Sequence, residues 1–197
     1  MVDTLVRAGA VVNQRHRNGE TALIAAARVG HSDVVNLLIT VGANVNLLDA
    51  YRNSPLQAAA YAGSIECARF LLRAGADIKQ RCQGGGTALT TAAYYGHQGF
   101  VVFLMEANAP INTADDTGRS PLSFAASRGH TGIVQLLCEA NADLEIRDAF
   151  GTSALSAAAF YGHADIVQVL IDTKADFRIR ERDGRTALVI AAEQGHV

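Results

Sequence analysis

The sequence contains no tryptophan, three prolines and three cysteines among its 197 residues. No apolar run approaches the roughly 18 residues of a membrane-spanning helix, and the first ten residues follow a helical pattern rather than a secretory signal. The cysteines, Cys67, Cys82 and Cys138, form no closely spaced pair, which argues against a disulfide framework or a zinc module. These absences predict a soluble protein without membrane insertion in a reducing compartment, the cytoplasm, with the nucleus as an open alternative.

Charge of either sign is also scarce. Seventeen Lys and Arg residues face nineteen Asp and Glu residues, so the net charge of −2 supplies no field for non-specific binding to nucleic acid or an anionic membrane. With 49% apolar and 18% charged residues, the chain is able to bury a core, which excludes disorder. Alanine is abundant, at 35 residues, and indicates closely packed helices of small side chains.

One pattern recurs every 33 residues through the chain. A triplet that begins with Thr or Ser and ends with Leu starts at residues 21, 54, 87, 120, 153 and 186. Two alanines follow three residues after each leucine, and a glycine follows three residues after the second alanine. A fixed period of this length predicts a repeat architecture and takes precedence over any residue-level interpretation.

Each period predicts two short helices and a turn. The Ser or Thr caps the first helix, Pro55 and Pro121 occupy the first helical position, and the Leu and Ala residues share one face. The second helix also has an apolar stripe, and it ends near Gly or Asn in most repeats but near Lys174 in one. Neither helix is long enough to be stable alone, so the repeats must stack into an all-α solenoid.

The residues Ser54-Pro55-Leu56, Ala59-Ala60, Gly63 and Gly75-Ala76-Asp77 resemble the ankyrin repeat family. The resemblance covers the whole chain and implies a β-hairpin finger, two antiparallel helices and a loop in each repeat, with a concave face that binds proteins. The histidine that usually follows the Thr-Pro-Leu triplet is absent, which puts its hydrogen bonds in question. Arg52 occupies the position at which the other fingers have glycine and predicts a strained or differently shaped finger.

The register divides the chain into a single array of repeats. Complete repeats are expected at 16–48, 49–81, 82–114, 115–147 and 148–180, with partial repeats at 1–15 and 181–197. Both partial repeats have an apolar stripe that a further repeat would have to cover, so we expect the chain to be part of a longer array.

No enzyme, metal site or cofactor site is predicted. Five histidines follow the glycine that ends the first helix, namely His31, His97, His130, His163 and His196. Helices pack about 8–10 Å apart, too far for neighbouring histidines of this column to share a zinc ion with bonds of about 2 Å. Local backbone hydrogen bonds are the simpler role for these side chains.

The resemblance implies that two columns after the Ala-Ala pair, three finger positions and the residue before each finger line the binding groove. These columns hold all five tyrosines and ten of the fifteen arginines of the chain. Both residue types dominate interface hot spots, so a protein partner is predicted: a peptide or folded segment with carboxylate or phosphate groups between apolar anchors. The candidate contact residues are Tyr51, Tyr61, Tyr94, Tyr95, Arg119, Arg128, Phe150, Phe160 and Tyr161, with Tyr94 and Tyr95 at the energetic centre.

Three alternatives stay open. The chain could be a regulatory or substrate-recruiting arm of a larger enzyme, channel or ubiquitin ligase. It could bind nucleic acid through its finger arginines, although four acids interrupt that patch: Glu20, Asp116, Asp183 and Glu193. The tyrosines could instead pack between repeats, in which case Tyr94→Ala would lower stability rather than affinity.

The family resemblance also implies a modification. Asn13, Asn46 and Asn112 each follow a Val or Ile and have a leucine eight residues earlier, which is similar to the pattern hydroxylated by an asparaginyl hydroxylase in other ankyrin arrays.

Overall fold

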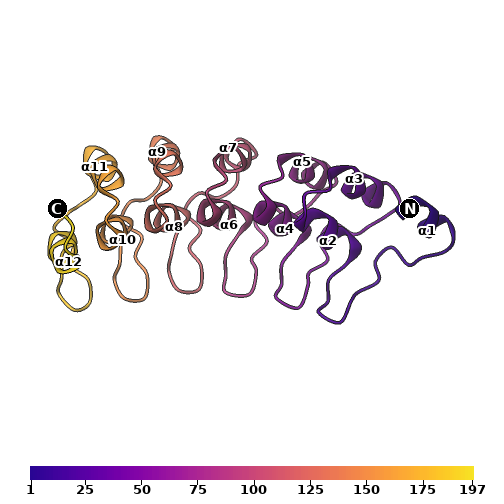
Figure 1. The fold of residues 1–197 in the computed structure, drawn as a ribbon, viewed down its shortest axis with the longest axis horizontal. Helices are drawn as coiled ribbons and strands as arrows, with labels where there is room; N and C mark the ends of the chain where they lie inside the picture. Colours follow the sequence, from indigo (N-terminus) through magenta and orange to yellow (C-terminus); the bar gives the residue numbers. More distant parts are fainter. The chain divides into compact units, whose positions relative to one another are not determined.

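The computed structural model describes residues 1–197, which form twelve helices and no β-strand. First and second helices alternate along the chain, and from α2 onward the starting residues of each kind recur every 33 residues, which confirms the all-α repeat fold (Figure 1). The first helices are α2 (Ala22–Arg28), α4 (Pro55–Ala62), α6 (Ala88–Tyr95), α8 (Pro121–Ser127), α10 (Ala154–Tyr161) and α12 (Ala187–Gln194). The second helices are α1 (Val2–Arg7), α3 (Ser32–Thr40), α5 (Ile65–Arg73), α7 (Gln98–Glu106), α9 (Thr131–Glu139) and α11 (Ala164–Asp172).

The chain divides into two compact units, unit 1 (residues 1–91) and unit 2 (residues 92–197). In unit 1, α2 packs against α3 and α4, and α5 packs against α3 and α4. In unit 2, α10 packs between α8 and α12, while α9 contacts both α7 and α11. Both units thus consist of one layer of first helices and one layer of second helices. No helix of the chain combines the length and the hydrophobicity needed to cross a bilayer.

The core of each unit lies between these layers. The leucine and the two alanines of the first helices from α2 to α10 are almost completely buried, as Leu122, Ala125 and Ala126 show in α8. The second helices α3, α5, α7, α9 and α11 contribute one buried leucine each, such as Leu71 in unit 1 and Leu137 in unit 2. Burial of a leucine side chain contributes about 2 kcal/mol, so the repeated leucines stabilise the stack.

The start of each first helix follows the predicted capping. The Ser120 hydroxyl group accepts a hydrogen bond from the Ser123 backbone N–H at 3.2 Å, and the same contact recurs in the other repeats. In α4, the Gln57 side chain replaces the missing family histidine. Its Oε1 accepts from the Ser54 N–H at 3.0 Å, and its Nε2 donates to the Gly86 carbonyl oxygen at 2.9 Å. This side chain therefore caps its helix and holds the following finger.

The fingers are tight turns, so the expected β-hairpin strands are absent. In the finger of residues 115–119, the Asp115 N–H donates to the Arg119 carbonyl oxygen at 2.9 Å, and the Gly118 N–H donates to the Asp115 carbonyl oxygen at 3.0 Å. Consecutive fingers of unit 2 are joined by backbone hydrogen bonds from Ala149 to Thr117 and from Arg182 to Phe150, at 2.9 and 3.0 Å. One bond per finger pair is too few for a strand ladder.

Four side-chain-bearing residues adopt the left-handed backbone conformation at positions where other repeats have glycine: Arg52, Asn108, Asn141 and Lys174. Arg52 has a φ of 60°, which confirms the predicted strain, and its turn is nevertheless closed like the others, by the Arg52 N–H and the Asp49 carbonyl oxygen at 3.0 Å. Lys174 ends α11 with a φ of 72°. A residue with a Cβ atom pays about 1 kcal/mol for this conformation relative to glycine.

Candidate functional site

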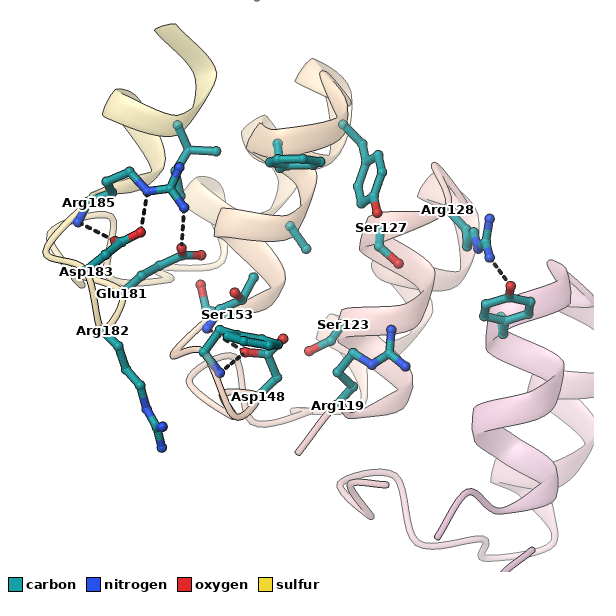
Figure 2. A pocket seen from close by; sticks show the side chains of 17 residues that line it. Arg119, Ser123, Ser127, Arg128, Asp148, Ser153, Glu181, Arg182, Asp183 and Arg185 are labelled. Carbon is teal, nitrogen blue, oxygen red and sulfur yellow. Dashed lines mark hydrogen bonds and ion pairs between the residues drawn. The ribbon is translucent and has the colours of Figure 1, made fainter. Parts of the chain in front are cut away.

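A groove of about 440 Å³ crosses unit 2 at the first helices α8, α10 and α12 and their fingers. Aromatic, arginine and small side chains line most of it (Figure 2). The lining residues are Tyr94, Arg119, Ser123, Ser127, Arg128, Asp148, Phe150, Thr152, Ser153, Ala157, Phe160, Tyr161, Glu181, Arg182, Asp183, Arg185 and Ile190.

One wall of the groove alternates arginine and aromatic groups. The Arg119 guanidinium lies 4.4 Å from the centroid of the Phe124 ring, which meets the Tyr94 ring edge-on at 5.6 Å. The Arg128 guanidinium lies over the Tyr94 ring, 4.1 Å from its centroid, and donates a hydrogen bond to the Tyr94 hydroxyl group. We call these four residues the cation-aromatic wall. Each cation faces the electron-rich surface of a ring, so the wall is held in one arrangement.

The opposite side is aromatic without arginine. Phe160 and Tyr161, at the end of α10, meet edge-on with ring centroids 5.0 Å apart. Tyr161 also stacks on the His163 ring at 6.3 Å. Phe150 lies on the finger that precedes α10 and is 74% exposed. An apolar ring this exposed is available to a partner without any rearrangement.

Small side chains separate these two sides. Ser123 and Ser127 come from α8, and Ser153 and Ala157 come from the start and middle of the α10 region. Ser127 occupies the same repeat position as Tyr94 and Phe160, where the neighbouring repeats of unit 2 place rings. Its hydroxyl group donates to the Phe124 carbonyl oxygen at 2.9 Å and so turns back to its own helix. The absence of a ring at Ser127 leaves space between two aromatic sides.

The carboxylates of the groove are already occupied. Asp148 accepts the Phe150 and Thr152 N–H groups at 2.8 and 2.9 Å. Arg185 binds three carboxylates, those of Asp183, Glu193 and Glu181, at 2.7, 2.9 and 3.5 Å. The pKa of Asp183 is lowered, mainly because its carboxylate accepts a hydrogen bond from the Arg185 backbone N–H. The pKa of Arg185 is raised, mainly by its hydrogen bond to the Glu193 carboxylate.

Arginine donors, by contrast, remain available. The Arg182 side chain extends away from Glu181 and Asp183 and makes no ion pair (Figure 2). Arg119 pairs loosely with Asp115 at 3.6 Å, and Arg128 uses one nitrogen on Tyr94. Because a guanidinium carries five N–H donors, these three arginines retain most of their capacity to bind an anion.

His130 supports the cation-aromatic wall from behind. Its Nε2 donates to the Tyr94 carbonyl oxygen at 3.1 Å, since a carbonyl oxygen is an acceptor only. Burial lowers the pKa of His130, and the positive charges of Arg128, His97 and His163 lower it further. His130 therefore bonds the backbone of the preceding repeat rather than its own turn, and His196 does the same with the Phe160 carbonyl oxygen. Among all described residues, no group of His, Cys, Asp or Glu is placed to hold a metal ion.

Six of the nine predicted contact residues line this one groove: Tyr94, Arg119, Arg128, Phe150, Phe160 and Tyr161. Tyr95 is 46% exposed and lies against Tyr94, with ring centroids 5.0 Å apart, but it does not line the groove. Tyr51 and Tyr61 are exposed side chains of unit 1. The expectation that Tyr94 faces away from repeat packing is wrong, because its ring contacts Phe124 and Arg128 of the next repeat.

Sequence reasoning missed Phe124 altogether. It lies two residues after the leucine of α8, where most repeats have alanine or threonine, and only 8% of it is exposed. The sequence signal that could have identified Phe124 was a single aromatic residue in a column that holds mostly small residues. Its contribution to the wall depends on the direction of its side chain, which the repeat register does not specify.

The three candidate modification sites lie outside the groove, in the loops after second helices. The Asn46 Nδ2 donates to the Gly75 carbonyl oxygen at 3.0 Å, and its Oδ1 accepts the Asp77 N–H at 2.9 Å. Asn13 makes the equivalent pair with Gly42 and Asn44, and Asn112 accepts the Asp143 N–H at 2.9 Å. Each side chain thus connects one repeat to the next.

Comparison with known proteins identifies this arrangement of helix pairs and turns. The ankyrin repeat profile matches residues 1–82, 74–148 and 140–197 as three copies. The crystal structure of the human ASB11 ankyrin repeat domain is 26% identical and superimposes with a TM-score of 0.90, over 96% of this chain and 85% of that one. A search of curated proteins gives no significant match. Ankyrin repeats generally mediate protein–protein interactions, and the profile covers the entire sequence, so the chain belongs to the ankyrin repeat family.

Proposed function

We propose that the chain is a non-catalytic protein-interaction module and that a partner segment lies along the groove of unit 2. The observation that carries this proposal is the exposure of aromatic and arginine side chains in a preformed groove. Phe150, Phe160 and Tyr161 offer apolar area, while Arg119, Arg128 and Arg182 retain hydrogen-bond donors. Aromatic and arginine side chains carry most of the energy in protein interfaces.

The charge distribution favours a partner with anionic groups between apolar anchors. Every carboxylate of the groove is bonded either to a backbone N–H or to Arg185, so the groove has no strong acceptor for a partner's cation. Carboxylate and phosphate groups both match the planar guanidinium donors. Nucleic acid fits less well, since the finger arginines alternate with Asp148, Glu181 and Asp183.

The test is a phage-displayed library of protein fragments selected on the whole chain. Fragments that are enriched are then measured by calorimetry against the wild type and against Phe150→Ala. We expect affinity to fall at least tenfold, because truncation of a central ring removes about 2 kcal/mol. Phe177→Ala is the matched control, since Phe177 is also an exposed ring of unit 2 but lies outside the groove. Enriched fragments that are indifferent to Phe150 and to Tyr161→Ala would exclude the groove as the binding site.

A further inference from the structure

The space above Ser127 has walls that select its occupant. The Tyr94 ring, with Phe124 behind it, closes one side, and Phe160 and Tyr161 close the other. Small side chains, Ser123, Ser127, Ser153 and Ala157, lie between these sides, so no group of the chain fills the space. We call it the Ser127 slot. First helices of adjacent repeats lie about 10 Å apart, so a position occupied by Ser in place of a ring leaves room for one large side chain.

Arg128 lies at the edge of this slot and is already oriented. Its guanidinium lies 4.1 Å from the centroid of the Tyr94 ring, and one of its nitrogens donates to the Tyr94 hydroxyl group. The other N–H donors of the guanidinium remain available for an anion. Arg119 lies over Phe124 at 4.4 Å, and it is also held by its Nε, which donates to the Thr117 hydroxyl group at 3.1 Å, and by its ion pair with Asp115 at 3.6 Å. Because both arginines are fixed by the rings, an anion binds them without the usual entropic cost of ordering two long side chains.

The attraction for an anion is local. Unit 2 contains thirteen acidic and eight basic residues, so its overall charge repels anions. Of the acidic side chains that line the groove, Glu181 and Asp183 nevertheless pair with Arg185, and Asp148 accepts backbone N–H groups. A single arginine at the slot is therefore expected to decide whether an anionic group is accepted.

We propose that the Ser127 slot receives one large aromatic or aliphatic side chain of the partner segment and that Arg128 and Arg119 bind a carboxylate or phosphate group within about two residues of it. This inference rests on the proposed function and names the partner chemistry that the groove selects. Size complementarity comes from the aromatic sides and the small residues between them, and charge complementarity comes from the two ring-supported arginines.

The experiment uses pools of synthetic 12-residue peptides and the whole chain. One central position is fixed as Trp, Leu or Ala, and a position two residues away is fixed as Glu, phosphoserine, Gln or Lys, while the remaining positions are random. Fluorescence anisotropy gives the dissociation constant of each pool. We expect the Trp pools with Glu or phosphoserine to bind at least tenfold more tightly than the Ala pool with Gln. The Glu and phosphoserine arms show which anion is preferred.

Substitutions then assign the preference to the slot. Ser127→Trp fills the space and should abolish the advantage of Trp over Ala, whereas Gln135→Trp, an exposed position on α9 of the same repeat, should not. Arg128→Met keeps the packing on Tyr94 but removes the charge, so the advantage of Glu over Gln should fall about tenfold. Arg178→Met removes the same charge from an exposed position outside the groove and should leave that advantage unchanged. Ser127→Leu provides the same test if the tryptophan variant fails to fold.

Several results would overturn the inference. If Lys pools bind best, the anion assignment is wrong. If the pools bind but Ser127→Trp changes nothing while Phe150→Ala weakens them, the slot is wrong and the groove function stands. If no pool exceeds the Ala and Gln pool, the slot is wrong as well, and the fragment selection described above then decides separately whether the groove binds proteins.

Discussion

The Arg128 guanidinium lies 4.1 Å from the centroid of the Tyr94 ring and donates a hydrogen bond to its hydroxyl group. The two residues belong to successive repeats of unit 2, and Phe124 packs edge-on against the same ring. We therefore expect Tyr94→Ala to lower the free energy of unfolding by about 2 kcal/mol. Tyr94→Phe keeps the ring and should lose less than about 1 kcal/mol. Urea denaturation measures both effects.

Tyr51 is the control for this prediction. Its ring is 62% exposed on a finger of unit 1, so Tyr51→Ala should change stability by less than about 0.5 kcal/mol. Equal losses in Tyr94→Ala and Tyr51→Ala would show that the contacts of Tyr94 do not stabilise the stack.

Arg52→Gly should stabilise the protein by about 1 kcal/mol. Arg52 has a φ of 60°, at which glycine has no steric penalty, and its side chain makes no ion pair that the substitution would break. Gly118 occupies the position of Arg52 in another finger, and Gly118→Ala is the reverse change, from glycine to a residue with a Cβ atom. A Cβ atom there would lie 2.7 Å from the Arg147 carbonyl oxygen, so this variant should be less stable than the wild type. Thermal unfolding of the two variants should therefore shift in opposite directions.

Acid should weaken unit 2 through His130. Burial and nearby positive charges lower the pKa of His130 in the folded protein, so the unfolded chain binds the proton more strongly. The stabilising contribution of neutral His130 is complete above about pH 6.5 and is lost as the pH falls below that value. We expect His130→Asn to show a smaller loss of stability than the wild type between pH 7.5 and 5.5, measured by urea denaturation. Identical losses would contradict this assignment.

The asparagine modification should depend on local opening. Both polar atoms of the Asn46 side chain are bonded to the next repeat, to the Gly75 carbonyl oxygen and the Asp77 N–H. An enzyme that adds oxygen to this side chain must first separate it from these partners. We expect mass spectrometry of protein from its native cell to detect hydroxylation at Asn13, Asn46 or Asn112. Lack of any added oxygen at the three positions would remove the proposal.

Hydrogen exchange should be fastest in the helices that bury least. No residue of α1 is buried, and only Ile190 is buried in α12, whereas α9 buries Ile133, Val134 and Leu137. Repeats are stabilised mainly by their neighbours, so the amides of α1 and α12 should open before those of α9. Self-association would protect both helices, so exchange is measured at several protein concentrations and compared at the lowest. Equal protection in the dilute protein would contradict the prediction.

The sequence predicted the elements that depend on local backbone chemistry. The 33-residue register located the first and second helices, the Ser and Thr caps, the prolines at the first helical positions and the strained backbone of Arg52. These features follow from single residues and their immediate neighbours, so a single sequence is sufficient to find them. Of the nine contact residues chosen from the register, six line one groove of the structure.

The contacts between repeats could not be predicted in the same way. The register gives the column of a residue but not the direction of its side chain, so it placed Tyr94 on a free surface although the ring packs against Phe124. It also puts Arg185 in one of the finger columns that the resemblance assigns to the groove, although three carboxylates surround its guanidinium. Such arrangements depend on side-chain rotamers, which periodicity does not encode.

The backbone hydrogen bonds between fingers have a consequence for redesign. The bond from the Arg182 N–H to the Phe150 carbonyl oxygen, like that from Ala149 to Thr117, uses no side-chain atom. The identity of residues 117, 150 and 182 can therefore change without breaking the linkage, provided that the new residue is not proline at a donor position. A combinatorial library at these tips should keep the scaffold folded while it explores new recognition, so the same molecule is a starting point for engineered binders.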